Sequence, residues 1–312
     1  MRVGVIDCGT NTFNILIAEF HNGGHEILFS TKIAVKLAPS IDTNMIGSNR
    51  FGRGLDALLV HKNILENYQT ERVYLFATSA IRDSANGKEF VQQVKEALNF
   101  DIHVIGGDEE AELIYEGVIQ DIQFEDDVDL IMDIGGGSVE FILAHVHGIL
   151  WKRSFPIGVS RLKGMFMPSD PMTEEESGKI QEFLFGALEP LFEEIGKHQP
   201  KRLIGSSGSF DSIIDMLTSG KSPLKPSPTG GLIIPLERYS ELSQQLQYST
   251  LEERLNLPGL IPMRADMIVL AFMLINSVLE HSHIPLSEII HTRFALKEGA
   301  LARIERKIQL LE

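Results

Sequence analysis

Apolar residues fall into two repeating patterns along this chain. Short apolar runs bounded by glycine or polar residues are typical of buried strands, and apolar residues three or four positions apart are typical of helices. The first pattern predicts strands at residues 3–6, 13–18, 26–35, 73–77, 102–105, 130–132, 139–144, 151–155, 202–205 and 287–291. The second predicts helices at 55–68, 174–197, 236–247, 261–283 and 296–311, and others that open at TSAIRDSANG, IGGDEEAELIYEGV and GSSGSFDSIIDML.

This alternation of strands and helices predicts an α/β fold with mixed sheets. The chain has 312 residues, of which 43% are apolar, and chains beyond about 250–300 residues tend to split into domains. We therefore expect two domains, residues 1–120 and 121–296, with the closing helix at 297–312 packing back on the first. Residues 219–231, rich in serine, proline and glycine, form the clearest loop.

Two segments of the chain align without a gap at an offset of 126 residues: VGVIDCGTNTFNILIA and DLIMDIGGGSVEFILA. The alignment places Asp7 on Asp133, Gly9 on Gly135, Thr12 on Ser138 and Ala18 on Ala144. Each copy reads as a strand, a tight turn and a second strand. Two unrelated hairpins would explain each copy separately, but the shared positions favour a functional pair.

The chemistry of the two turns suggests phosphate binding. Glycine lets a turn present successive backbone N–H groups to an anion. An aspartate at the end of each first strand, Asp7 or Asp133, would repel phosphate unless it faced a hard cation, and Mg²⁺ favours oxygen ligands. Two such turns from two domains could hold a phosphate chain across a cleft. The duplicated Asp-x-Gly hairpins resemble those of the actin, hexokinase and chaperone ATPase superfamily, whose domains are ribonuclease-H-like.

Charge and composition limit the possible partners. Lys and Arg number 28 against 43 Asp and Glu, a formal net charge of −15, so the basic footprint of a nucleic-acid-binding protein is missing. A polyanionic ligand must therefore be held locally, by backbone N–H groups, a metal ion and a few basic side chains. The ten histidines show no zinc-binding spacing.

The same features favour a cytoplasmic protein without a membrane partner. Cys8 is the single cysteine, which rules out an intramolecular disulfide and fits a reducing compartment. No signal segment is recognisable at residues 1–20. No apolar run approaches the ~20 residues of a membrane-spanning helix.

An acidic cluster opens the helix after residue 106. Its members are Asp108, Glu109, Glu110 and Glu112. Acidic residues are favoured at helix N-termini by about 0.3–1 kcal/mol, which explains one or two of them. The Gly-Gly entry after a strand also aims a first-turn side chain at the strand ends, where ligands of α/β sheets bind.

Six motifs in order resemble the exopolyphosphatase / guanosine pentaphosphate phosphatase family. They are VGVIDCGTNTFN, TSAIRDSANG, IGGDEEAELIYEGV, MDIGGGSVEF, FPIGVSRLKGMF and GSSGSFDSI, and a weaker match resumes at LPGLIPMRADMI and LKEGAL. The resemblance implies two ribonuclease-H-like, actin-like ATPase domains with mixed sheets flanking a central cleft. It also implies hydrolysis of polyphosphate or guanosine pentaphosphate with Mg²⁺.

The resemblance implies a role for particular residues. Glu110 corresponds to the catalytic base, Glu140 to an acid that positions water or metal, and Arg82 to a substrate-phosphate arginine. Asp7 and Asp133 correspond to the metal-facing acids. The phosphate-binding loops correspond to Gly9, Thr10, Asn11, Gly135, Gly136, Gly137, Ser138 and, in GSSGSFDSI, Gly208.

Several interpretations stay open at this stage. Arg82 could instead pair with Asp83 or Glu89. The segment around Gly208 could hold a base or ribose, or only start a helix, and Arg161 and Lys163 could line a polyanion route or lie on the surface. Arg264 and Asp266 are expected to form a structural pair, and Cys8 to be a packing residue.

Two other functions compete with phosphate hydrolysis. One is a small-molecule kinase using ATP, which would need an acceptor pocket and an aspartate base. The other is a nucleotide-switched binding or filament protein related to actin or the chaperones. The sequence does not decide between polyphosphate and guanosine pentaphosphate as the preferred substrate. It also leaves open whether the protein forms a homodimer.

Overall fold

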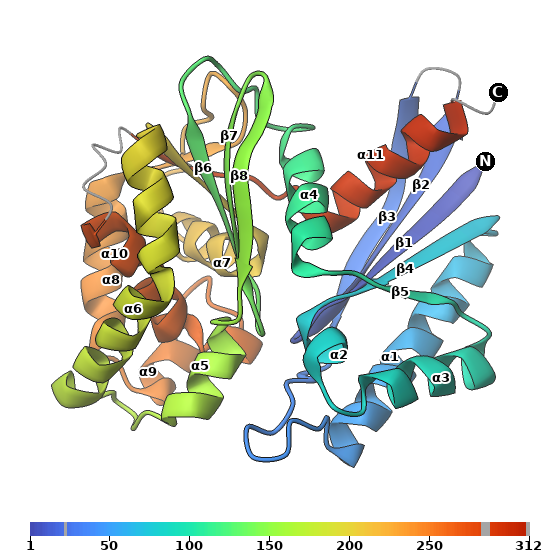
Figure 1. The fold of residues 1–312 in the computed structure, drawn as a ribbon, viewed down its shortest axis with the longest axis horizontal. Coiled ribbons are helices and arrows are strands. Elements are labelled where there is room, and N and C mark those ends of the chain that lie inside the picture. The colour runs from blue at the N-terminus through green and yellow to red at the C-terminus, as the bar shows by residue number, and fades with distance from the viewer. Residues whose placement is uncertain (22–23, 282–287, 310–312) are drawn as a thin grey trace. The chain divides into compact units, whose positions relative to one another are not determined.

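The computed structural model describes residues 1–21, 24–281 and 288–309. The chain divides into two compact units: unit 1 comprises Met1–Gly117 with Ala295–Glu312, and unit 2 comprises Val118–Phe294. Each unit is built around one mixed sheet, with helices packed against it (Figure 1). Unit 2 is therefore continuous in sequence, whereas unit 1 is completed by the last residues of the chain.

The sheet of unit 1 has the strand order β3-β2-β1-β4-β5. Strands β1, β2 and β3 form an antiparallel meander, and β4 and β5 continue the sheet parallel to β1. The strands are β1 (Arg2–Cys8), β2 (Thr12–His21), β3 (Gly24–Ala34), β4 (Arg72–Ala77) and β5 (Ile102–Val104).

The sheet of unit 2 has the order β10-β11-β9-β6-β7-β8. Without the edge strand β10 it repeats the order and directions of the first sheet, so the sequence duplication is also a structural one. This repeated five-strand order is that of a ribonuclease-H-like domain and confirms the predicted fold class. The strands are β6 (Asp129–Ile134), β7 (Val139–His145), β8 (Gly148–Phe155), β9 (Arg202–Ser206), β10 (Leu232–Ile234) and β11 (Glu288–His291).

The helices of unit 1 depart from the sequence prediction at two places. Helix α1 (Ser48–Asn67) begins earlier than residue 55, where its apolar stripe starts. The helix expected to open at TSAIRDSANG is split into α2 (Ser79–Asp83) and α3 (Gly87–Leu98). The chain turns sharply between them. The turn brings Gly87 so close to α2 that an added Cβ would lie 1.9 Å from the carbonyl oxygen of Ile81.

The closing helix α11 (Leu296–Gln309) packs on β1, β2 and α4 (Gly107–Val118) within unit 1. Two glycines allow α4 and α11 to touch: a Cβ at Gly117 would lie 2.0 Å from the Ala295 carbonyl oxygen, and one at Gly299 would lie 1.8 Å from that of Leu113. An ion pair of 2.6 Å between Arg303 and Glu116 joins the two helices further along. Residues 310 and 311 of the predicted helix lie outside the described residues.

Unit 2 carries more short helices than the apolar pattern predicts. Its α-helices are α5 (Val159–Phe166), α6 (Glu174–His198), α7 (Ser207–Thr218), α8 (Leu236–Gln247), α9 (Leu251–Leu255) and α10 (Ile268–His281). The helix predicted over 261–283 is a 3₁₀ turn, η1 (Pro262–Arg264), followed by α10. Residues 282, 283 and 287 of the predicted elements lie outside the described residues.

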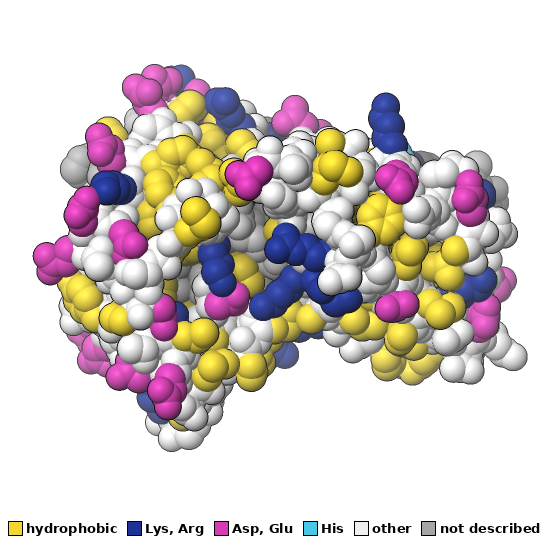
Figure 2. All heavy atoms as spheres, turned by 90° about the horizontal axis from the view of Figure 1, so that it is seen from below, with side chains coloured by type: hydrophobic (Ala, Val, Ile, Leu, Met, Phe, Trp, Pro, Cys, Tyr) yellow, Lys and Arg dark blue, Asp and Glu magenta, His cyan; other side chains and the backbone are white. Residues whose placement is uncertain are grey.

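Charged side chains of both signs lie on the surface (Figure 2). On the face shown in Figure 2, acidic side chains are scattered between apolar and uncharged ones. Within the described residues, no helix is both long and apolar enough to span a bilayer.

We predict that the ion pair between β6 and β9 is critical for the stability of unit 2. Asp129 is fully buried, and Arg202 binds both of its oxygens, Nε to Oδ1 at 2.7 Å and Nη2 to Oδ2 at 2.6 Å. Burial raises the pKa of Asp129 and Arg202 counteracts this. Arg202→Met would leave a buried carboxylate without its cation, so the free energy of unfolding should fall by about 3–5 kcal/mol in urea denaturation.

The exposed pair Lys179–Glu175 provides the matched control. Lys179→Met should leave the urea midpoint unchanged, because exposed ion pairs contribute little. Adding Asp129→Asn to Arg202→Met removes the buried charge and should recover most of the loss. Equal midpoints for wild type and Arg202→Met would contradict the prediction.

Candidate functional site

Three parallel strands of unit 1 end together. Cys8 on β1 lies in register with Ala77 on β4, and Ala77 with Val104 on β5. The turn after β1, helix α2 after β4 and helix α4 after β5 therefore all begin at the carboxyl edge of one sheet, where α/β proteins bind ligands.

The first predicted phosphate turn lies at this edge. Gly9 closes it by donating its N–H to the carbonyl of Thr12 at 3.1 Å. The turn's carbonyl groups accept hydrogen bonds from the segment around the end of β3: Leu37 N to Thr10 O at 2.7 Å, and Val35 N and Lys36 N to Asn11 O at 2.9 and 3.1 Å. The N–H of Thr10 donates to no described residue. The turn thus has its acceptors occupied and at least one donor available.

Arg82 and Glu110 come together at the same edge. Nη1 of Arg82 donates to Oε2 of Glu110 at 2.7 Å and to the Ile105 carbonyl at 3.2 Å, while Nε donates to Asp83 at 3.0 Å. Glu110 is only 7% exposed. Burial lowers the pKa of Arg82, but the charges of Glu110 and Asp83 raise it more, so the net shift is upward.

Other acids near the start of α4, Glu109 in its first turn and Glu112 just after it, have different partners. Glu109 lies 3.6 Å from both His103 and Arg303, and Glu112 lies 3.5 Å from Arg303. They are also much more exposed than Glu110. Glu110 is the member of the cluster that the fold buries beside an arginine, so the helix-dipole explanation suffices for its neighbours but not for it.

The second predicted turn repeats the first in unit 2. Gly135 donates its N–H to the carbonyl of Ser138 at 3.0 Å, as Gly9 does to Thr12. Here the start of α5 occupies the turn's carbonyls: Val159 N to Gly135 O at 3.1 Å, Ser160 N to Gly136 O at 2.8 Å, and Gly158 N and Arg161 Nε to Gly137 O at 3.3 and 3.0 Å. The N–H groups of Gly136, Gly137 and Ser138 donate to no described residue. Arg161 therefore supports the turn.

Two buried carboxylates lie beside this turn. Asp133 on β6 and Glu140 on β7 are cross-strand partners, and they are 5% and 1% exposed. Side chains opposite each other in an antiparallel pair point to one face. Oδ2 of Asp133 accepts hydrogen bonds from Ser206 and Ser207 at 2.7 and 2.6 Å, and Glu140 accepts one from Ser154 at 2.6 Å.

The equivalent pair in unit 1 is not two acids. Asp7 lies opposite Asn14, whose amide donates to Asp7 Oδ2 at 2.9 Å. Asn14 occupies the position that Glu140 has in the second copy, at the same offset of 126 residues. The carboxylate pair is therefore specific to unit 2.

Arg264 lies beside a glycine of the third predicted loop, a contact that the sequence interpretation missed. Its guanidinium packs on Gly208 in the first turn of α7, where a Cβ would lie 1.8 Å from Nη2, and Nη1 donates to Ser212 at 2.8 Å. Burial lowers the pKa of Arg264. The negative charges of Asp211 and Asp215 raise it by less, so the net shift is downward. Gly208 is thus explained by the close approach of an arginine.

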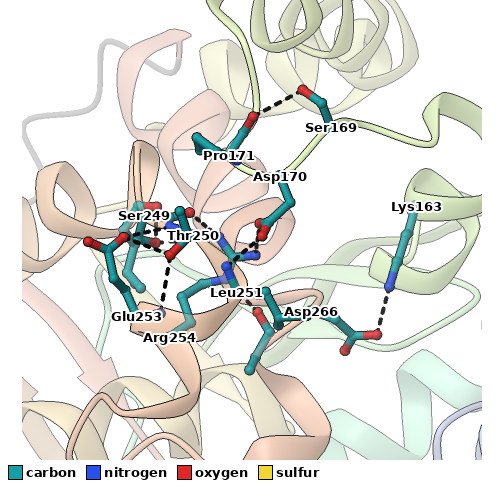
Figure 3. Close-up of polar contacts among 12 residues, drawn as sticks. Lys163, Ser169, Asp170, Pro171, Ser249, Thr250, Leu251, Glu253, Arg254 and Asp266 are labelled. Atoms are coloured by element: carbon teal, nitrogen blue, oxygen red, sulfur yellow. Dashed lines mark hydrogen bonds and ion pairs between the residues drawn. The ribbon is translucent and has the colours of Figure 1, made fainter.

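The predicted pairing of Arg264 with Asp266 is wrong. Asp266 instead receives a hydrogen bond of 2.7 Å from Lys163 on α5 (Figure 3). In the sequence, Arg264 stands shortly before an apolar helix. That position is compatible both with an ion pair to Asp266 and with a contact to α7, so it could not identify the contact with Gly208.

Asp133 and Glu140 suit a metal ion that takes few of its ligands from the protein. Among the described residues, no three His, Cys, Asp or Glu side chains converge. Mg²⁺ is usually bound by one or two carboxylates together with waters and substrate phosphates, which the pair Asp133 and Glu140 could provide. Cys8 offers no nucleophile, because burial and then Asp7 raise the pKa of its thiol well above its ordinary value.

Residues 16–308 match the model of the Ppx/GppA phosphatase family. A crystal structure of an exopolyphosphatase from Cytophaga hutchinsonii is similar to this chain with a TM-score of 0.93 and 37% identity, covering 98% of each chain.

Curated relatives agree with this match. Exopolyphosphatase 1 of Mycobacterium tuberculosis is 26% identical and covers 97% of this chain and 88% of its own length. The guanosine-5'-triphosphate,3'-diphosphate pyrophosphatase of Photobacterium profundum is 27% identical, over 97% of this chain and 59% of its own length. The chain belongs to the Ppx/GppA phosphatase family.

Proposed function

We propose that this protein is a phosphohydrolase that releases orthophosphate from the end of polyphosphate or of the guanosine pentaphosphate tail. The observation that carries the proposal is a buried carboxylate, Glu110, held by Arg82 at the sheet edge where the first phosphate turn lies. The names of the relatives, exopolyphosphatases and a guanosine pentaphosphate pyrophosphatase, support this substrate class.

Glu110 is the proposed general base. It would orient a water molecule and accept its proton. The water oxygen bonds to the terminal phosphorus while the bond from that phosphorus to the bridging oxygen breaks. The shortened chain leaves with the electron pair of that bond. Since phosphoryl transfer needs little covalent help from the protein, alignment of the water and stabilisation of charge are the main tasks.

Arg82 has two proposed tasks. Through Nη1 it fixes the orientation of the Glu110 carboxylate. Its Nη2 donates to no other described residue, which leaves a charged donor for a phosphate oxygen.

The two turns are the proposed phosphate-binding elements. The N–H of Thr10 in unit 1 and those of Gly136, Gly137 and Ser138 in unit 2 are the available donors, with Gly9, Asn11 and Gly135 shaping the turns. Backbone donors held in place before the substrate arrives cost no reorganisation during the reaction. Arg264 packs on Gly208, the residue after Ser207, and Ser207 donates a hydrogen bond to Asp133.

We also propose Mg²⁺ as the cofactor. Phosphatases of this family generally depend on a metal. Asp133 and Glu140 would hold the ion in unit 2, and Asp7 would be the acid of the first turn. The ion, when bound, would offset the charge of the phosphate oxygens. A reducing, cytoplasmic setting fits the single buried Cys8.

The competing functions have less support. A small-molecule kinase would transfer phosphate to an acceptor, whereas the family is one of phosphatases. A nucleotide-switched binding protein would not need a buried base such as Glu110. Release of orthophosphate from polyphosphate in the absence of any acceptor distinguishes hydrolysis from both.

Glu110→Gln should lower kcat for orthophosphate release by about 100- to 10,000-fold, because glutamine cannot accept the proton of water. Orthophosphate is measured with polyphosphate and, separately, with guanosine pentaphosphate. Glu109→Gln, in the same helical turn, is the matched control and should keep the wild-type rate. A Glu110→Gln protein with normal turnover would place the base elsewhere.

Asp133→Asn should raise the Mg²⁺ concentration for half-maximal rate by about 10- to 100-fold. Loss of the negative charge weakens the binding of Mg²⁺, while the amide oxygen of the new asparagine can still accept hydrogen bonds from Ser206 and Ser207. The measurement is the rate of orthophosphate release across a Mg²⁺ titration, with Asp127→Asn as a control six positions earlier in the chain. An unchanged Mg²⁺ requirement would remove Asp133 from the metal site.

Gly158→Ala should lower kcat/KM about 100-fold, because misplacing a binding group by roughly 1 Å can cost that much. An added Cβ would lie 2.5 Å from the carbonyl carbon and oxygen of Gly136 and from the nitrogen of Gly137, so the turn must shift. Gly186→Ala is the control, since a Cβ there meets nothing within 4 Å. Equal kcat/KM for the two variants would show that the turn is not a phosphate-binding element.

A further inference from the structure

Unit 2 contains a cavity that includes none of the proposed site residues. It lies between helices α6, α8 and α10 and has a volume of about 110 Å³. One water needs about 10–15 Å³ on a comparable measure. The α6–α8–α10 cavity therefore has room for a compact organic group.

Four apolar side chains are among the residues that line the cavity. Phe272 and Met273 on α10 are buried, and Val269 and Met172 are partly exposed. Phe272 is fixed by stacking on Tyr239, with ring centroids 5.2 Å apart and an interplanar angle of 11°. A ligand would meet methyl groups and an aromatic edge there, which favours a hydrocarbon body.

The walls carry polar groups with and without partners. Asn276 is held on both sides, since Tyr239 Oη donates to its Oδ1 at 2.8 Å and its Nδ2 donates to Ser243 Oγ at 2.9 Å. By contrast, the side chains of Ser177 and Gln181 hydrogen-bond to no other described residue. They remain available to a ligand.

The charged residues of the cavity lining are both acidic. Glu174 on α6 and Glu280 on α10 are the charged residues that line the cavity, and neither forms an ion pair with a described residue. Glu280 lies in the last turn of its helix, where the macrodipole disfavours a carboxylate. Glu280 also acts on the buried Tyr239. Burial, and after it the negative charge of Glu280, raise the pKa of the Tyr239 hydroxyl well above its ordinary value.

The wall formed by Met172 and Thr173 is held in place before any ligand binds. Asp170, two positions earlier, accepts hydrogen bonds from Arg254 at 2.6 Å and from the N–H of Leu251 at 2.7 Å (Figure 3). Thr173 caps α6 through a reciprocal pair of hydrogen bonds with Glu176. A cavity with fixed walls loses little entropy on binding.

We propose that the α6–α8–α10 cavity binds a small aliphatic amine, with its hydrocarbon body on Phe272 and Met273 and its ammonium group beside Glu280 and Glu174. The carboxylates repel phosphate, so the cavity is a second ligand site with a charge preference opposite to that of the substrate. Because this inference rests on the cavity alone, it stands or falls independently of the proposed phosphohydrolase activity.

The test uses three probes with the same four-carbon body: butylammonium, butanol and butyrate. The full chain is labelled with ¹³C at the methionine methyl groups, and the signals of Met172 and Met273 are identified by Met→Leu variants. Butylammonium should shift both signals saturably, butanol should do so more weakly, and butyrate should not. No saturable shift with butylammonium, or an equal response to butyrate, would overturn the proposal.

The charge dependence is tested by Glu280→Gln. This variant should weaken butylammonium binding by roughly tenfold, the size of one charge-assisted interaction, and leave butanol binding unchanged. Glu182→Gln, exposed on α6 outside the cavity, is the matched control and should bind as wild type does. An unchanged Kd in Glu280→Gln, in a protein whose other methionine signals keep their positions, would also overturn the proposal.

Discussion

The pairing of Arg82 with Glu110 is the interaction on which the proposed chemistry of unit 1 depends. A carboxylate that is 7% exposed needs a partner to stay charged in the interior. The partner comes from the helix after β4 and the carboxylate from the helix after β5, so the parallel register of these strands creates the pair. The sheet therefore does more than support the site, because it determines which two side chains meet.

The two hairpins show how a duplicated element diverges while its backbone is kept. Both turns are closed by the same hydrogen bond, from Gly9 to Thr12 and from Gly135 to Ser138. The side chains opposite the strand-end aspartates differ, asparagine in unit 1 and glutamate in unit 2. The amide of Asn14 donates a hydrogen bond to Asp7, whereas Glu140 places a second negative charge beside Asp133, as the proposed metal site of unit 2 requires.

The fold class and the two glycine turns could be predicted from the sequence, because the signals for them are local. The repeated Asp-x-Gly turn and the alternation of strands and helices are local signals, and they predicted the fold class that the repeated sheet order confirms. The contact of Arg264 with Gly208 joins segments far apart in the chain, and no local pattern encodes it. The same is true of the Lys163–Asp266 pair, which replaces the expected partner of Asp266.

Helix α11 has a consequence for how the protein is made. Unit 2 is one continuous stretch, so its core can close as soon as residue 294 has left the ribosome. Most of unit 1 precedes unit 2 in the sequence, but it needs α11 to cover β1, β2 and α4, and α11 follows unit 2. Domains usually complete folding in N- to C-terminal order during translation. In this chain unit 2 can finish folding first, while the sheet of unit 1 keeps one surface uncovered until α11 has been translated.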